Sequence, residues 1–281
     1  MSDEPRPRQA LDALLRLPDE AIDLAQAALL IARDEYPDLE VGDYLRTLDG
    51  MAVDLRARLR GGEGPTSLIA HLNRYLFEDL GFRGNVEEYD DPRNSYLNDV
   101  LDRRVGIPIS LSTVYMEVGR RAGVPLAGVS FPGHFLVRYA GAGIPDEILI
   151  DPFHRGIMVT PEECRRRLEE RFSGRIAFRP ELLRRARNRE ILERMLNNLR
   201  RLFDSGRDYS RALRVQNRLL CLRPSSPGHL KDRGLLHYRL ALFGQARADF
   251  EACLRLAPAA ADAAALREQL GRLRLLTPVM N

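Results

Sequence analysis

The spacing of apolar residues changes character along the chain and first indicates helices. In the first part of the sequence, apolar positions recur every three or four residues, which is the period of an amphipathic helix. Proline and glycine interrupt the pattern at Pro37, at residues 61–65 and at Gly81. Helices are therefore expected over residues 19–36, 41–59, 67–80, 94–104 and 110–121.

Three short segments rich in β-branched and aromatic residues follow these helices. They cover residues 124–131, 134–140 and 147–153, and turn sequences separate them at Pro132-Gly133 and over residues 141–146. Connections this short favour an antiparallel meander. Helices followed by such a sheet are typical of an α+β fold.

From Thr160 onward the pattern predicts only helices, and part of it repeats. Residues 209–224 and 243–258 align without gaps at an offset of 34 residues. A helix–turn–helix period of 34 residues is that of the tetratricopeptide (TPR) repeat. Residues 261–276 are then expected to form a terminal capping helix. We expect two domains, a core over residues 1–185 and a repeat domain over residues 186–281.

Charge is distributed unevenly over the 281 residues. The net charge is only +3, but residues 1–164 carry 17 basic and 28 acidic side chains, whereas residues 165–281 carry 26 and 12. The basic half could bind an acidic protein partner or nucleic acid, or pack against the acidic half. Nucleic acid is the weaker reading because no aromatic residues are interleaved with the basic ones and no DNA-binding helix signature is present.

The sequence predicts a cytoplasmic protein without membrane contact. No apolar run reaches the roughly 18 residues that a membrane span needs, and the first ten residues lack the apolar core of a signal peptide. Three scattered cysteines, Cys164, Cys221 and Cys253, do not suggest a disulfide framework.

Three side chains stand where hydrolytic chemistry could occur: Ser110 near a helix start, His134 at a strand start and Asp151 at a strand end. Helix start, histidine and aspartate are the order of nucleophile, base and orienting group in papain-like and transglutaminase-like enzymes. Ordinary structural roles compete with this reading, namely a helix cap for Ser110 and turn positions for His134 and Asp151. His154 could join His134 in a metal site, but the spacing is not typical of zinc, so no metal or cofactor is expected.

The motifs RRVGIPISL, FPGHF and IDPF resemble those of the bacterial transglutaminase-like/TPR proteins of the Sir B type, over roughly residues 20–275. The resemblance implies a transglutaminase-like, cysteine-protease-like core followed by helical repeats. The wider superfamily carries Gly-x-Cys at the helix start, then histidine and aspartate, which correspond here to His134 and Asp151. The cysteine position corresponds to Pro108, and no cysteine of the chain lies near it in the sequence.

Two functions remain as hypotheses. The first is a non-catalytic interaction or regulatory protein, a pseudoenzyme whose repeats bind a protein partner, with an acidic segment favoured by the basic half. The second is a hydrolase or acyl-transfer enzyme that uses Ser110, or a water molecule, with His134 and Asp151.

Overall fold

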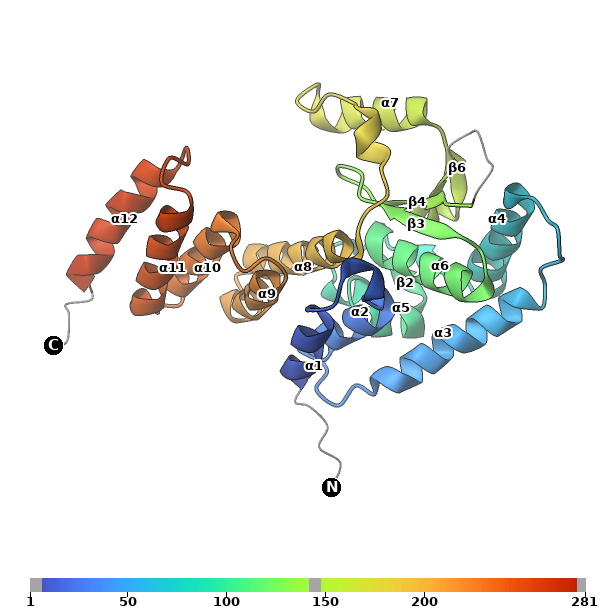
Figure 1. Ribbon diagram of the computed structural model, residues 1–281, viewed down its shortest axis with the longest axis horizontal. Coiled ribbons are helices and arrows are strands. Elements are labelled where there is room, and N and C mark those ends of the chain that lie inside the picture. The colour runs from blue at the N-terminus through green and yellow to red at the C-terminus, as the bar shows by residue number, and fades with distance from the viewer. Residues whose placement is uncertain (1–6, 142–147, 277–281) are drawn as a thin grey trace. The chain divides into compact units, whose positions relative to one another are not determined.

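The computed structural model describes residues 7–141 and 148–276 of the chain (Figure 1). Contacts within the chain divide it into two compact units, one ending at Met195 and one beginning at Leu196. The turn expected over residues 141–146 lies outside the described residues except for Gly141. No described helix is long and apolar enough to cross a membrane.

Helix α6 (Pro108–Ala122) is the central element of the first unit. It contacts helices α2, α3 and α5, and it also contacts the sheet. Thirteen of its fifteen residues are buried, which explains why its apolar pattern does not follow a single stripe. The other helices of this unit are α1 (Pro7–Leu14), α2 (Leu24–Ala32), α3 (Val41–Arg56), α4 (Pro65–Asn73), α5 (Leu97–Arg103) and α7 (Pro161–Phe172).

The expected helices are present, with one addition and one change of type. Helix α1 was not predicted. The segment after α4, Arg74–Asp79, is a turn of π-helix rather than a continuation of the α-helix, and the Leu80 N–H donates to the Tyr75 carbonyl. These differences leave the predicted order of elements unchanged.

A four-stranded antiparallel sheet follows α6, in the order β3-β4-β5-β6. Its strands are β3 (Leu126–Val129), β4 (Leu136–Tyr139), β5 (Leu149–Asp151) and β6 (Ile157–Val159). The meander of three strands is confirmed, but β6 was missed, as was the two-residue parallel pair β1 (Arg83–Gly84) and β2 (Val105–Gly106). The α+β class of this unit is confirmed.

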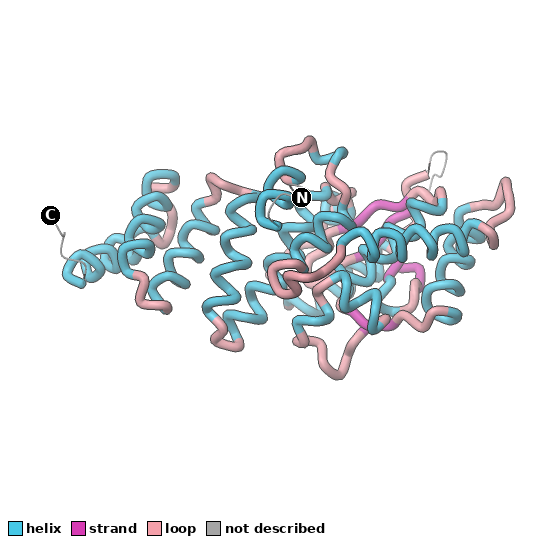
Figure 2. The backbone as a smooth tube through the Cα atoms, turned by 90° about the horizontal axis from the view of Figure 1, so that it is seen from below, coloured by secondary structure: helices cyan, strands magenta, loops and turns pink. Residues whose placement is uncertain are grey.

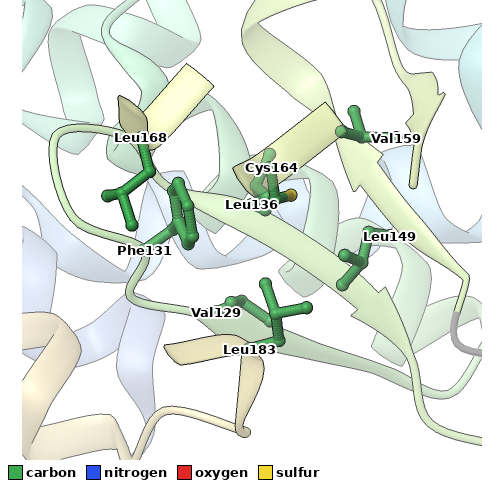
Figure 3. Packing of buried hydrophobic residues seen from close by; sticks show 8 residues of the cluster. All are labelled: Val129, Phe131, Leu136, Leu149, Val159, Cys164, Leu168 and Leu183. Carbon is green, nitrogen blue, oxygen red and sulfur yellow. The ribbon is translucent and has the colours of Figure 1, made fainter. Parts of the chain in front are cut away.

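One face of the sheet packs against α7 (Figure 3). Cys164 and Leu168 of α7 are its buried contacts, so the Cys164 thiol serves as a small apolar side chain in the core. Side chains alternate between the two faces of a strand, so Val137 and Ile150, both fully buried, point to the opposite face. The cluster around α7 comprises Val129, Phe131, Leu136, Leu149, Val159, Cys164, Leu168 and Leu183.

The second unit is entirely helical, as the 34-residue repeat predicts (Figure 2). Helix α8 (Asn188–Ser205) begins in the first unit and ends in the second. Gly234 allows a close approach inside the second repeat, because a Cβ there would lie 2.4 Å from the Phe250 ring. The remaining helices are α9 (Tyr209–Leu222), α10 (Pro227–Arg239), α11 (Phe243–Leu256) and α12 (Ala263–Leu276).

A buried carboxylate links the two helices of the second repeat. Asp249 of α11 is 4% exposed, and its oxygens accept from Arg233 Nη2 at 2.6 Å and from Arg233 Nε at 2.9 Å. His237 Nδ1 lies 2.9 Å from Asp249 Oδ2. In the first repeat, the positions 34 residues earlier hold buried apolar side chains: Leu199, Phe203 and Val215.

Candidate functional site

Asp151 is the centre of a polar cluster in the first unit. It ends β5, and Pro152 directly after it starts a single 3₁₀ turn over Pro152–His154. The carboxylate is fully buried. Asp151 Oδ1 lies 2.8 Å from His134 Nε2, and Asp151 Oδ2 lies 2.8 Å from His154 Nδ1. The structure thus brings together His134 and Asp151, which the sequence separates by 17 residues.

A tight turn between β3 and β4 positions His134. Gly133 adopts a φ of +74°, a left-handed conformation that glycine reaches without strain, and the His134 N–H donates to the Phe131 carbonyl at 3.1 Å. The imidazole is 18% exposed. His134 is therefore a turn residue in its backbone and a partner of Asp151 in its side chain.

Arg167 of α7 completes the set of groups around Asp151. Its Nη1 donates to Asp151 Oδ2 at 2.8 Å, and its Nε donates to Glu163 at 2.9 Å. Burial tends to raise the pKa of Asp151, but the hydrogen bonds and charges of His134, His154 and Arg167 outweigh it and hold that pKa well below its usual range. Asp151 is therefore ionised at neutral pH.

Sequence reasoning did not identify Arg167. The segment Arg165-Arg166-Arg167 presents three consecutive arginines, and no pattern in it marks one as special. Only the packing of Cys164 and Leu168 against the sheet turns the Arg167 side chain toward the end of β5.

Ser110 lies apart from this cluster in its hydrogen bonding. Its hydroxyl is fully buried, donates to the Asn94 carbonyl at 2.6 Å and accepts from the Ile107 N–H at 3.1 Å. A Cβ at Gly106 would lie 2.7 Å from Ser110 Oγ, so the glycine provides room for this arrangement. The hydroxyl joins the start of α6 to the preceding loop.

No thiol stands at the start of α6. Pro108 is the first residue of the helix, where a missing N–H costs nothing. Cys164 belongs to the apolar cluster between α7 and the sheet, and Cys221 and Cys253 belong to helices of the second unit.

Aromatic side chains border the histidines. The Phe153 ring meets His134 edge-on at a centroid distance of 6.1 Å and His154 at 5.2 Å. Tyr89 meets the other side of Phe153 at 6.1 Å. The His154 side chain is 51% exposed, so the cluster reaches solvent on the side of His154.

Fold and site together define a transglutaminase-like core followed by tetratricopeptide repeats. The sequence profile of the Transglutaminase-like superfamily matches residues 42–197, and that of the Tetratricopeptide repeat matches residues 199–271. A UPF0162 protein of Xylella fastidiosa (strain 9a5c) is 42% identical over 251 residues, which cover 88% of each chain. A UPF0162 protein of Pseudomonas aeruginosa is 33% identical over 268 residues, covering 95% of this chain and 96% of the relative. The chain belongs to the UPF0162 family, which confirms the resemblance to Sir B-type proteins.

A part of the chain also resembles a eukaryotic protein. Human F-box only protein 21 is 33% identical over 184 residues, which cover 55% of this chain and 29% of the human protein. No solved structure shows significant similarity to the chain.

Proposed function

We propose that the chain is a non-catalytic, regulatory interaction protein of the cytoplasm, whose repeat unit binds a segment of a protein partner. The observation that carries this proposal is the start of α6. The position where transglutaminase-like enzymes hold their thiol is Pro108, and the nearest candidate hydroxyl, that of Ser110, is buried and bonded to two backbone groups. A core without an accessible nucleophile leaves recognition as the main task.

The charges of the second unit favour an acidic partner segment. Residues 196–281 carry 15 basic and 7 acidic side chains. Each acidic side chain has a basic partner inside the unit, so the fold neutralises its own acids and keeps a surplus of positive charge. A surface of this kind attracts a negatively charged segment and raises its rate of association. The pairs are Asp204–Arg239, Asp208–Arg211, Asp232–Arg200, Asp249–Arg233, Glu251–Arg247, Asp262–Lys231 and Glu268–Arg272.

The test uses cross-linking capture with the full chain as bait, followed by affinity measurement with the identified partner. Reversing two exposed charges of the second unit, Arg201→Glu and Arg255→Glu, should weaken binding and flatten its salt dependence. The matched control reverses two exposed arginines of the first unit, Arg60→Glu and Arg83→Glu, and should bind as the native chain does. A partner held equally by both double variants, or no partner at all, would refute the proposal.

A second candidate is a hydrolase or acyl-transfer enzyme that activates water. The 2.8 Å contact between His134 Nε2 and Asp151 favours it, because such a carboxylate orients an imidazole for proton transfer. With Nε2 facing Asp151, Nδ1 is the ring nitrogen left to take a proton from water. Hydrolysis of amide or ester substrates by the native chain, lost in His134→Ala, would support this candidate. Labelling of Ser110 by a fluorophosphonate probe would instead identify a serine nucleophile.

A further inference from the structure

We propose that His134, Asp151 and His154 bind one divalent transition-metal ion, with zinc as the type case. Each residue offers one donor atom, and the three donor atoms lie within 4.8 Å of one another. The proposal is independent of partner binding by the repeats. It rests on the geometry of the core alone.

The distances are close to those a metal requires. Zinc binds imidazole nitrogen at about 2.0–2.1 Å and carboxylate oxygen at about 2.0–2.2 Å, so neighbouring donors of a tetrahedral site lie about 3.4 Å apart. Each histidine nitrogen now lies 2.8 Å from an Asp151 oxygen. The donors must separate by about half an ångström, and the half-exposed His154 side chain has the freedom to move by that amount.

The donor types select the class of ion. Two imidazoles and one carboxylate suit zinc, iron, copper or nickel, whereas magnesium and calcium prefer oxygen ligands alone. Metal-binding carboxylates are themselves hydrogen-bonded in known sites, and Arg167 provides that bond to Asp151 Oδ2. Glu163 pairs with Arg167, so the four charged groups Asp151, Glu163, Arg167 and the ion would nearly balance.

Three protein ligands leave a coordination position free. Catalytic zinc sites have this composition, with water or substrate in the fourth position, while structural sites use four protein ligands. The free position would lie toward the solvent-exposed side of His154. A water held there would be a stronger acid than bulk water, which gives the core a chemical group that its cysteine-free sequence lacks.

The experiment measures metal binding by the full chain, free of any affinity tag and stripped with a chelator. Titration with Co²⁺ followed by visible absorption, and with Zn²⁺ by calorimetry, should show one ion per chain with micromolar or tighter affinity. His154→Ala should weaken binding by more than about tenfold, because it removes a direct ligand. The control His71→Ala removes a histidine that pairs with Glu63 on α4, and should leave the affinity unchanged.

Circular dichroism of His154→Ala confirms that the variant is folded, as expected for a half-exposed side chain. The proposal is overturned if the native chain binds no ion stoichiometrically. It is equally overturned if His154→Ala binds as tightly as the native chain, because any ion must then be held elsewhere.

Discussion

Two serines of α6 offer a direct test of what Ser110 does. Ser110 and Ser112 are both fully buried and lie two residues apart on the same helix. Ser110 Oγ bonds to the Asn94 carbonyl and to the Ile107 N–H, whereas Ser112 Oγ has no hydrogen-bond partner among the described residues. Replacing each by alanine removes the same atom from the same helix, but only one change removes hydrogen bonds.

The magnitudes follow from those bonds. In Ser110→Ala the Asn94 carbonyl and the Ile107 N–H lose their short contacts and keep only the weaker bond of 3.4 Å between them. A buried polar group left without a good partner costs about 1–3 kcal/mol, and the helix preference of alanine returns about 0.5 kcal/mol, so the net loss is about 2 kcal/mol. Ser112→Ala removes an unpaired buried hydroxyl and should leave stability unchanged or raise it by about 0.5 kcal/mol.

Urea unfolding followed by tyrosine fluorescence measures the difference. The chain has no tryptophan, and seven of its nine tyrosines belong to the first unit, so this signal reports on the unit that contains α6. In a thermal scan, 2 kcal/mol corresponds to a midpoint about 4–8 °C lower for a domain of this size. Equal stability of the two variants would refute the reasoning and reopen a chemical role for Ser110.

Three further outcomes are expected. Gly234→Ala should destabilise the repeat unit by about 1–3 kcal/mol, since its Cβ would meet Phe250, whereas Gly271→Ala, with open space around it, should be neutral or stabilising; hydrogen exchange would localise the effect. Burial lowers the pKa of His237 below its unfolded value of about 6.5, so the unfolded chain binds more protons there and stability should fall as pH drops through that range. His237→Gln should flatten this dependence in urea unfolding at about pH 5.5 and 7.5, and an unchanged slope would contradict it. Asp151→Asn, measured with chelator present, should cost about 3 kcal/mol at neutral pH because it removes the anion from a buried cluster; an unchanged urea midpoint would argue against that.

The order of the elements could be predicted because most of them are long and strongly periodic. The repeat helices announced themselves by a gapless 34-residue offset, which no local irregularity obscures. Strand β6 escaped notice because it has only three residues and two of them, Ile157 and Met158, are half exposed. Without a buried alternation, a strand has no period to detect.

The candidate site was predictable only along the chain. Motif order pointed to His134 and Asp151, and the antiparallel arrangement of β4 and β5 brings their neighbourhoods together. The convergence of His154 and Arg167 on the same carboxylate depends on a turn and on the packing of α7, which sequence spacing does not encode. For this reason a donor set with no zinc-like spacing becomes compact only in three dimensions.

The buried Asp249 cluster makes the two repeats unequal as building blocks. If α10 slid along α11 by one turn, Asp249 would lose Arg233 and His237, and an abandoned buried charge costs about 3–5 kcal/mol. The same slip in the first repeat only exchanges one apolar neighbour for another, since the three equivalent positions there are apolar. The second hairpin therefore fixes its own alignment like a key, while the first tolerates adjustment, and a chimera that duplicates the first hairpin in place of the second should gain conformational freedom.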